Sequence, residues 1–161
     1  MHNENSAPIA LQRCGGLILV SDTPKGRGVF ASKDIPARTV IDTCPVLVLG
    51  IEENDTYVKH TVLYHYTYNW PSKDSDGKLT NTQAVILGLG SMFNHALDQN
   101  VGWERDVARS LVTYTALRDI KAGEELCISY GQRLTFKDAD APEPVTEDPS
   151  AVLSSIQLES E

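Results

Sequence analysis

Short apolar runs separated by turn residues occupy most of the chain, and this pattern is typical of a β-rich protein. The runs are rich in β-branched side chains and are bounded by glycine, proline, serine or aspartate, which commonly form turns. Six runs have the length and composition of strands: residues 17–20, 29–31, 40–42, 46–49, 111–115 and 126–129. The pattern therefore predicts a mostly β fold.

One segment between these runs has a different period. Residues 54–69 place apolar side chains at helical spacing, at Val58, Val62, Leu63 and Tyr66. Residues 82–92 are apolar and are interrupted by Gly88 and Gly90, which suits a short strand or helix that ends in a turn. We expect a small helical insert within the β domain.

A short pattern occurs twice along the chain. Residues 31–37 and 116–122 share alanine, aspartate, isoleucine and alanine at equivalent positions, 85 residues apart. Each copy lies between two strand-like runs, as a turn joining them would. A common turn met twice by chance would explain the repeat, but we favour one β unit used twice, at the two ends of a single domain.

Composition and charge narrow the classes of function. The chain has 161 residues, 41% of them hydrophobic, which suits one globular domain. No apolar run approaches the ~20 residues of a membrane-spanning helix, so we expect no membrane partner. The net charge is -8, from 22 acidic and 14 basic residues. This balance disfavours direct binding of nucleic acid and suits a cationic partner.

The cysteines and the C-terminal composition divide the chain further. Three scattered cysteines, at positions 14, 44 and 127, favour neither a disulfide framework nor a metal site. Residues 132–161 are rich in acidic residues and prolines, a composition typical of disorder. We therefore predict a polar segment over residues 1–10, a folded domain over residues 11–131, and an acidic, flexible tail over residues 132–161.

Three short motifs carry candidate chemistry, and each also has a purely structural interpretation. The glycines of residues 25–28 would bring backbone amides close to a ligand, or simply form a hairpin turn. Asn94 and His95, followed by Asn100, suit a ligand site or a polar turn with a structural histidine. Tyr130 ends an alternating run, so its ring points into a cleft or packs in the core.

Taken together and in this order, the three motifs resemble those of the SET domain, the fold of protein lysine methyltransferases. The resemblance is carried by residues 26–31, 93–100, 116–126 and 130–131. It implies a fold of several small curved sheets with a C-terminal pseudoknot, in which the segment with the last motif passes through a loop formed by the preceding one. Residues 46–83 would then be a variable insert.

The same resemblance implies S-adenosylmethionine as the cofactor and a lysine ε-amine as the methyl acceptor. The residues expected to bind the cofactor are Lys25, Gly26, Arg27, Gly28, Asn94, His95 and Tyr130. Tyr130 would be the catalytic residue, because its hydroxyl would align the amine. The candidates for the substrate channel are Trp103, Tyr114, Ile128 and Tyr66, with Tyr57, Tyr64, Tyr68 and Trp70 of the insert on the substrate side.

The chain departs from the family pattern at two places. Many members have Ser-Cys after Asn-His, with that cysteine joining later ones around zinc, whereas Ala96 and Leu97 stand here. We therefore expect no zinc module, and the segment after Gly131 or a second subunit of a homodimer to close the lysine channel. Related enzymes set the number of methyl groups with Phe or Tyr where Ile128 and Trp103 stand, so the degree of methylation stays open.

The expected function is methylation of a histone lysine, in the nucleus and with the cytoplasm as a second location. The acidic surface would suit a basic histone tail. One alternative is a methyltransferase of a non-histone protein lysine. The other is a catalytically silent SET domain that acts as a binding module, and the presence of Gly26, Gly28, Asn94 and Tyr130 argues against it.

Overall fold

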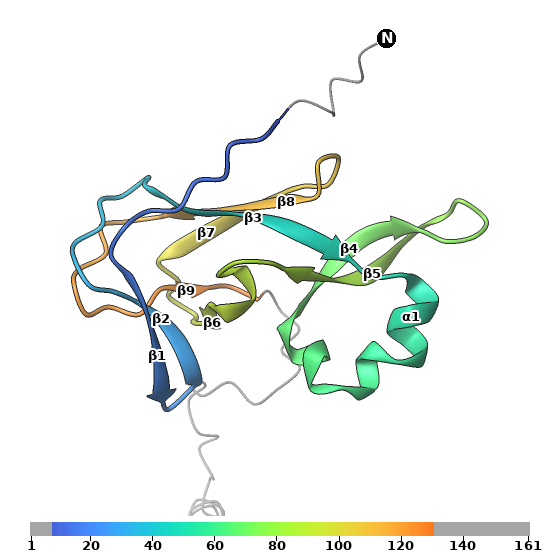
Figure 1. Ribbon diagram of the computed structural model, residues 1–161, viewed down its shortest axis with the longest axis horizontal. Coiled ribbons are helices and arrows are strands. Elements are labelled where there is room, and N and C mark those ends of the chain that lie inside the picture. Colours follow the sequence, from blue (N-terminus) through green and yellow to red (C-terminus); the bar gives the residue numbers. More distant parts are fainter. Residues whose placement is uncertain (1–7, 131–161) are drawn as a thin grey trace, which may run out of the picture.

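The computed structural model describes residues 8–130, and within them nine strands form three sheets (Figure 1). The strands are β1 (Leu17–Thr23), β2 (Gly26–Ala31), β3 (Val40–Val48), β4 (Thr67–Lys73), β5 (Leu79–Ile86), β6 (Asn94–His95), β7 (Val101–Asp106), β8 (Leu111–Ala116) and β9 (Cys127–Ile128). The helical elements are α1 (Ile51–Thr56) and three 3-10 turns, η2 (Val58–His60), η3 (Val62–Tyr66) and η4 (Gly90–Met92). The predicted mostly β fold is confirmed. The tail predicted over residues 132–161 lies outside the described residues.

The largest sheet has five antiparallel strands in the order β4-β5-β3-β8-β7. A hairpin of β1 and β2 forms a second sheet, and the third is a parallel pair of β6 and β9. One buried cluster joins the sheets, and its largest members are Ile41, Trp70, Ile86, Phe93, Tyr114, Ile120, Leu126 and Ile128. The small sheets thus share a core with the large one.

Residues 40–42 and 46–49 were predicted as two separate strands, which was wrong: residues 40–48 form the single strand β3. The strand changes partner at Pro45 and continues through it: residues 40–45 pair with β8, and residues 46–48 pair with β5. Proline favours an extended backbone and lacks only the amide donor. The carbonyl of Pro45 accepts a bond from the amide of Leu87 at 2.9 Å, so the proline marks a change of partner and not a turn.

The helix predicted over residues 54–69 is replaced by α1 and two 3-10 turns, and residues 67–69 belong to β4. The side chain of Glu53 accepts a bond from the Gly50 amide at 3.1 Å, which caps the start of α1. Strands β4 and β7 were missed. β4 contains Pro71, which an edge strand tolerates. β7 contains Gly102 and charged residues on the other edge of the same sheet.

The two repeated turns lie against each other as a pair related by a local two-fold. Ile35 and Ile120 exchange both backbone hydrogen bonds, at 2.8 and 2.9 Å. Three residues further on, Arg38 and Gly123 both have a positive φ, of 66° and 89°. Equivalent positions therefore share partners and backbone conformation, which confirms one β unit used twice.

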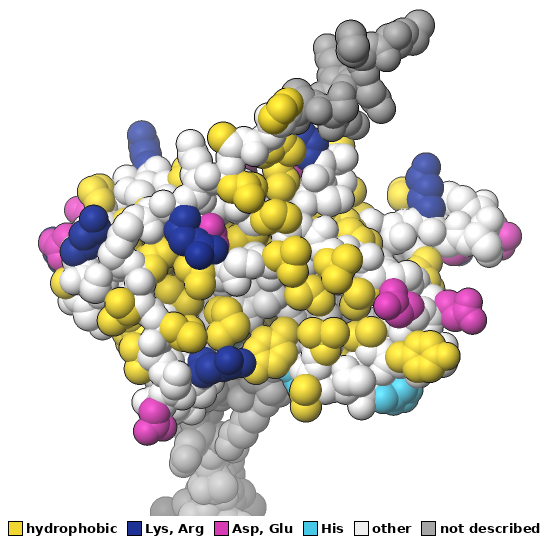
Figure 2. All heavy atoms as spheres, viewed as in Figure 1, with side chains coloured by type: hydrophobic (Ala, Val, Ile, Leu, Met, Phe, Trp, Pro, Cys, Tyr) yellow, Lys and Arg dark blue, Asp and Glu magenta, His cyan; other side chains and the backbone are white. Residues whose placement is uncertain are grey.

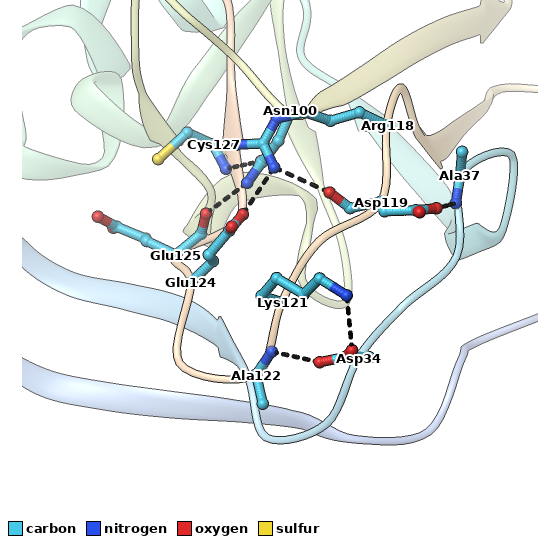
Figure 3. Close-up of polar contacts among 10 residues, drawn as sticks. All are labelled: Asp34, Ala37, Asn100, Arg118, Asp119, Lys121, Ala122, Glu124, Glu125 and Cys127. Atoms are coloured by element: carbon cyan, nitrogen blue, oxygen red, sulfur yellow. Dashed lines mark hydrogen bonds and ion pairs between the residues drawn. The ribbon is translucent and has the colours of Figure 1, made fainter.

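The aspartates of the repeat complete this pairing, which we call the clasp (residues 31–39 and 116–124; Figure 3). A carboxylate oxygen of Asp34 accepts a bond from the amide of Ala122 at 3.0 Å. Its equivalent, Asp119, accepts one from the amide of Ala37 at 2.8 Å. Each turn thus caps the backbone of the other.

The segment that leads into β9 lies between two strands remote from it in sequence. The amide of Leu126 donates to the carbonyl of Val29 in β2 at 2.7 Å, while β9 pairs with β6 on the other side. The buried Asn100 adds a bond from its Nδ2 to the carbonyl of Glu125 and accepts one from the amide of Cys127, at 2.8 and 2.9 Å. This placement brings all three motifs to one region.

Candidate active site

The tip of the β1–β2 hairpin is bound to β6 by two polar contacts. The ammonium of Lys25 donates to the carbonyl of His95 at 3.1 Å. In the opposite direction, Nδ2 of Asn94 donates to the carbonyl of Arg27 at 3.0 Å. Sequence reasoning had placed these four residues in one site, and the structure brings them together.

Gly28 leaves room for a carboxylate at the centre of this contact. A Cβ on Gly28 would overlap Oε1 of Glu125 and lie 3.1 Å from Nδ2 of Asn94. The Glu125 carboxylate accepts a bond from Nδ2 of Asn94 at 2.7 Å, so both donor bonds of that amide are used within the described chain. Oδ1 of Asn94 accepts no hydrogen bond from residues 8–130 and is left for a donor such as an ammonium group.

Tyr130 is held at three points by β6 and by Phe93, the residue before that strand. Its amide donates to Nδ1 of His95 at 3.2 Å, its ring lies 5.4 Å from the His95 ring, and its hydroxyl donates to the carbonyl of Phe93. Burial, with smaller contributions from Cys127 and Glu125, raises the pKa of Tyr130 to about 12. The phenol therefore stays protonated at neutral pH. Because its proton is used in the bond to Phe93, the phenol oxygen can meet a further polar group only as an acceptor.

An aromatic group lies beside the segment that carries Tyr130. Nε1 of Trp103 donates to the carbonyl of Ser129 at 3.1 Å, and its ring meets the ring of Tyr68 edge to face at 5.4 Å. The hydroxyl of Tyr114 donates to that of Tyr68 at 3.0 Å. Burial raises the pKa of both tyrosines well above the ordinary range, so their hydroxyls stay neutral.

The remaining channel candidates lie at different places. Tyr66 accepts a bond at its hydroxyl from Nη2 of Arg27 at 3.4 Å, so it lies beside the cofactor motif. Ile128 is fully buried in the core and pairs with His95. The contribution of both residues to a lysine channel stays a prediction.

The other aromatics of the insert differ in exposure. Tyr57 is 68% exposed, whereas Trp70 is 2% exposed and belongs to the core. Figure 2 shows apolar side chains gathered across the face between the β1–β2 hairpin and α1. The insert therefore presents only part of its aromatic residues to a substrate.

Sequence reasoning missed two contributors to the site. Glu125 was not singled out, because Glu124 stands beside it and nothing in the sequence indicates which of the two acids points to Asn94. The carbonyl of Phe93 leaves no sequence signal, since every residue has one. Tyr68 was expected on the substrate side, but the strand β4 that carries it was not, although residues 67–70 contain a β-branched residue and two aromatic ones.

In residues 8–130, no three His, Cys, Asp or Glu side chains are grouped as ligands of a metal ion. No helix in the same residues is long and apolar enough to cross a membrane.

The residues present fit a cationic cofactor with a free ammonium group. Oδ1 of Asn94 and the adjacent carboxylate of Glu125 suit an ammonium donor. Because Gly28 has no side chain, the Asn94 amide and the Glu125 carboxylate can lie in contact beside it. Gly26 has a φ of 86° and open space around its missing Cβ, so a ligand can approach the backbone there. S-adenosylmethionine carries such an amino group together with a sulfonium cation.

Two solved structures resemble this fold. One is a candidate histone methyltransferase of Plasmodium falciparum, with a TM-score of 0.53 and 21% identity, covering 76% of this chain and 96% of that one. The other is CpSET8 of Cryptosporidium, with a TM-score of 0.52 and 21% identity, covering 74% of this chain and 59% of that one. At this level of identity the likeness shows the fold alone.

The sequence comparisons are more specific. A curated histone-lysine N-methyltransferase of Schizosaccharomyces pombe (strain 972 / ATCC 24843), H3 lysine-37 specific, is 50% identical over 114 residues, which are 71% of this chain and 72% of that protein. The family model of the SET domain matches residues 26–131, which include all three motifs and every residue of the site described above except Lys25. The chain therefore belongs to the SET-domain family.

Proposed function

We propose that this protein is an S-adenosylmethionine-dependent lysine N-methyltransferase that acts on a histone. The observation that carries the proposal is the setting of Tyr130: a largely buried, protonated phenol whose hydroxyl donates to the Phe93 carbonyl, directly before the Asn94–His95 pair. Tyr130 lies two residues after β9 and bonds to His95 of β6, the strand that also carries Asn94, the residue expected to bind the cofactor.

The chain offers a distinct group for each part of the cofactor. Oδ1 of Asn94 would accept a bond from its amino group, and the backbone of Gly26 and Gly28 would lie against its methionyl end. His95 accepts a bond at its Nδ1 from the Tyr130 amide, which favours a role in bracing Tyr130 over direct contact with the adenine of the cofactor. When bound, S-adenosylmethionine supplies a methyl group on a sulfonium cation, so direct displacement needs no enzyme nucleophile.

The residues around Tyr130 suit a neutral lysine amine. A free lysine has a pKa of ~10.4, so about one in a thousand is deprotonated at neutral pH. Desolvation beside Trp103 and Tyr68 would favour the neutral form. The hydroxyl oxygen of Tyr130 would accept a hydrogen bond from the amine and orient its lone pair. Because its own pKa is about 12, Tyr130 aligns the amine and does not act as the base.

A histone is the favoured substrate for two reasons. The S. pombe relative is named for a histone H3 lysine, and half of the aligned residues are identical. The chain has a net charge of -8, which suits a basic tail. A lysine of a non-histone protein is the nearest alternative.

The test is transfer of a radiolabelled methyl group from S-adenosylmethionine to core histones, nucleosomes and a total protein extract, with wild type and Tyr130→Phe side by side. We expect a labelled histone band that Tyr130→Phe reduces at least tenfold, with cofactor binding by calorimetry unchanged. The variant keeps the ring on His95 and removes only the hydroxyl. Unchanged turnover in Tyr130→Phe would contradict the catalytic role of Tyr130. If wild type binds the cofactor but labels only another protein, that protein would replace the histone as the proposed substrate.

Nuclear location and a homodimer stay predictions from the family pattern. Fluorescence microscopy of the tagged full chain tests the first, and a diffuse cytoplasmic signal alone would contradict it. Sedimentation at nanomolar concentration tests the second, and a fully active monomer would contradict it.

A further inference from the structure

The two edge strands of the five-stranded sheet meet. In the strand order, β4 and β7 stand at opposite ends, yet Nη1 of Arg105 on β7 donates to the carbonyl of Asn69 on β4 at 2.8 Å. The rings of Tyr68 and Trp103 touch across the same junction, at 5.4 Å. The sheet therefore curls until its edges are joined by side chains instead of backbone bonds.

Arg105 is the centre of this junction. Its guanidinium carbon lies 5.1 Å from the ring centroid of Trp103 and 5.9 Å from that of Trp70. Trp103 and Arg105 are two residues apart on β7 and so point to the same face. Trp70 is buried, and the carbonyl of Asn69 receives one guanidinium bond, so the cation is fixed from the β4 side. It stacks on Trp103 in the geometry of a cation–π contact.

Trp103 extends the junction to the segment that carries Tyr130. Its Nε1 donates to the carbonyl of Ser129, the residue directly before Tyr130, at 3.1 Å. The contacts that hold Tyr130 itself come from β6 and the residue before it, at His95 and Phe93. The indole of Trp103 thus holds the segment from the β7 side.

We propose that Arg105 is a positioning residue for Tyr130 and acts through Trp103, an inference that rests on the proposed function. With Arg105 removed, the indole of Trp103 loses the cation that covers its ring. Its Nε1 is then no longer held in place for the bond to the Ser129 carbonyl. The Tyr130 hydroxyl then moves relative to the acceptor amine. Since a misplacement of about 1 Å can cost roughly 100-fold in rate, turnover should fall although Arg105 is exposed and touches no reacting atom.

The first test compares Arg105→Gln with Arg109→Gln. Arg109 lies after the same strand, and its guanidinium pairs with Asp106 at 2.6 Å, so its removal controls for the loss of one surface charge. We expect Arg105→Gln to lower kcat at least tenfold with the Kd of S-adenosylmethionine within twofold of wild type, and Arg109→Gln to stay within twofold in both. Arg105→Lys keeps a cation on the ring and should recover part of kcat. Equal effects of the two glutamine variants would overturn the proposal.

A second test asks whether Arg105 acts through Trp103. In a Trp103→Phe background, which removes the Nε1 donor, adding Arg105→Gln should lower kcat by less than twofold. Losses that multiply instead would show that Arg105 acts by another route.

Hydrogen exchange of the full chain separates this inference from the proposed function. Arg105→Gln should speed exchange of the amides in residues 127–130 and leave those of β8 unchanged. This readout needs no activity, so wild type without methyl transfer would refute the function while the exchange still tests the contact. Unchanged exchange in residues 127–130 would overturn the positioning role, whatever the activity.

Discussion

A single methyl group at Gly28 should weaken cofactor binding without unfolding the protein. Gly28 has an ordinary backbone conformation, so alanine is not strained there. The new Cβ would overlap Oε1 of Glu125, which is the end of a flexible side chain and can swing away. The cost therefore falls on the 2.7 Å bond between that carboxylate and Nδ2 of Asn94, and through it on the orientation of the Asn94 amide.

The size of the effect follows from the bond that is lost. A hydrogen bond to a charged group contributes about 1.5–3 kcal/mol. If this energy fixes Oδ1 of Asn94 toward the cofactor amino group, losing it weakens binding of S-adenosylmethionine about 10- to 100-fold, since each 1.4 kcal/mol is tenfold. The free energy of unfolding should fall by no more than the same amount, about 1.5–3 kcal/mol, because nothing in the core moves.

Isothermal calorimetry with S-adenosylmethionine on wild type, Gly28→Ala, Glu125→Ala and the double variant measures this directly. Removing the carboxylate removes the overlap, so Gly28→Ala should have little further effect in the Glu125→Ala background. Urea unfolding of the same four proteins controls for stability. An unchanged Kd in Gly28→Ala, or a loss of Kd that is the same in both backgrounds, would refute the reasoning.

Two further predictions concern stability. Gly90→Ala should cost about 1–3 kcal/mol by overpacking, because its Cβ would overlap the side chain of Ile86 and lie 2.7 Å from the hydroxyl of Tyr114; an unchanged urea midpoint would contradict this packing. The bond from the Ala122 amide, with the Lys121 ammonium beside it, lowers the pKa of Asp34 below its ordinary value of 3.8. Wild type should therefore unfold at a higher temperature than Asp34→Asn above that pH, and the difference should vanish as the pH falls through the folded pKa; thermal unfolding between pH 7 and 2.5 measures it, and a pH-independent difference would count against the charge.

The sequence predicts those strands whose own residues carry a strong local pattern. The β-branched runs at residues 17–20 and 111–115 lie in strands β1 and β8, because alternation and turn residues reflect the backbone directly. The motif residues Gly28, Asn94 and Tyr130 were found because a family pattern specifies them, although each alone has a structural explanation.

What the sequence leaves out depends on contacts between segments remote in the chain. β7 contains Gly102 and three charged side chains, and it is a strand because it pairs with β8, whose own pattern is strong. The contact of Arg105 with Asn69 arises only when the sheet curls, and curvature has no local signature. Likewise, Glu125 faces Asn94 only after β9 has been set beside β6.

The clasp explains how so short a sheet can hold a site. β6 and β9 share only two residue pairs, Asn94 with Cys127 and His95 with Ile128, and a parallel ladder of that length is too weak to fix its own register. The clasp joins the end of β2 to the residues before β9, and Asn100 bonds the backbone on both sides of Leu126, at the Glu125 carbonyl and the Cys127 amide. The residues that precede β9 thus fix its register, independently of its short pairing with β6. Tyr130, three residues after Cys127, inherits that register, which is why two turns 85 residues apart in sequence determine where its hydroxyl lies.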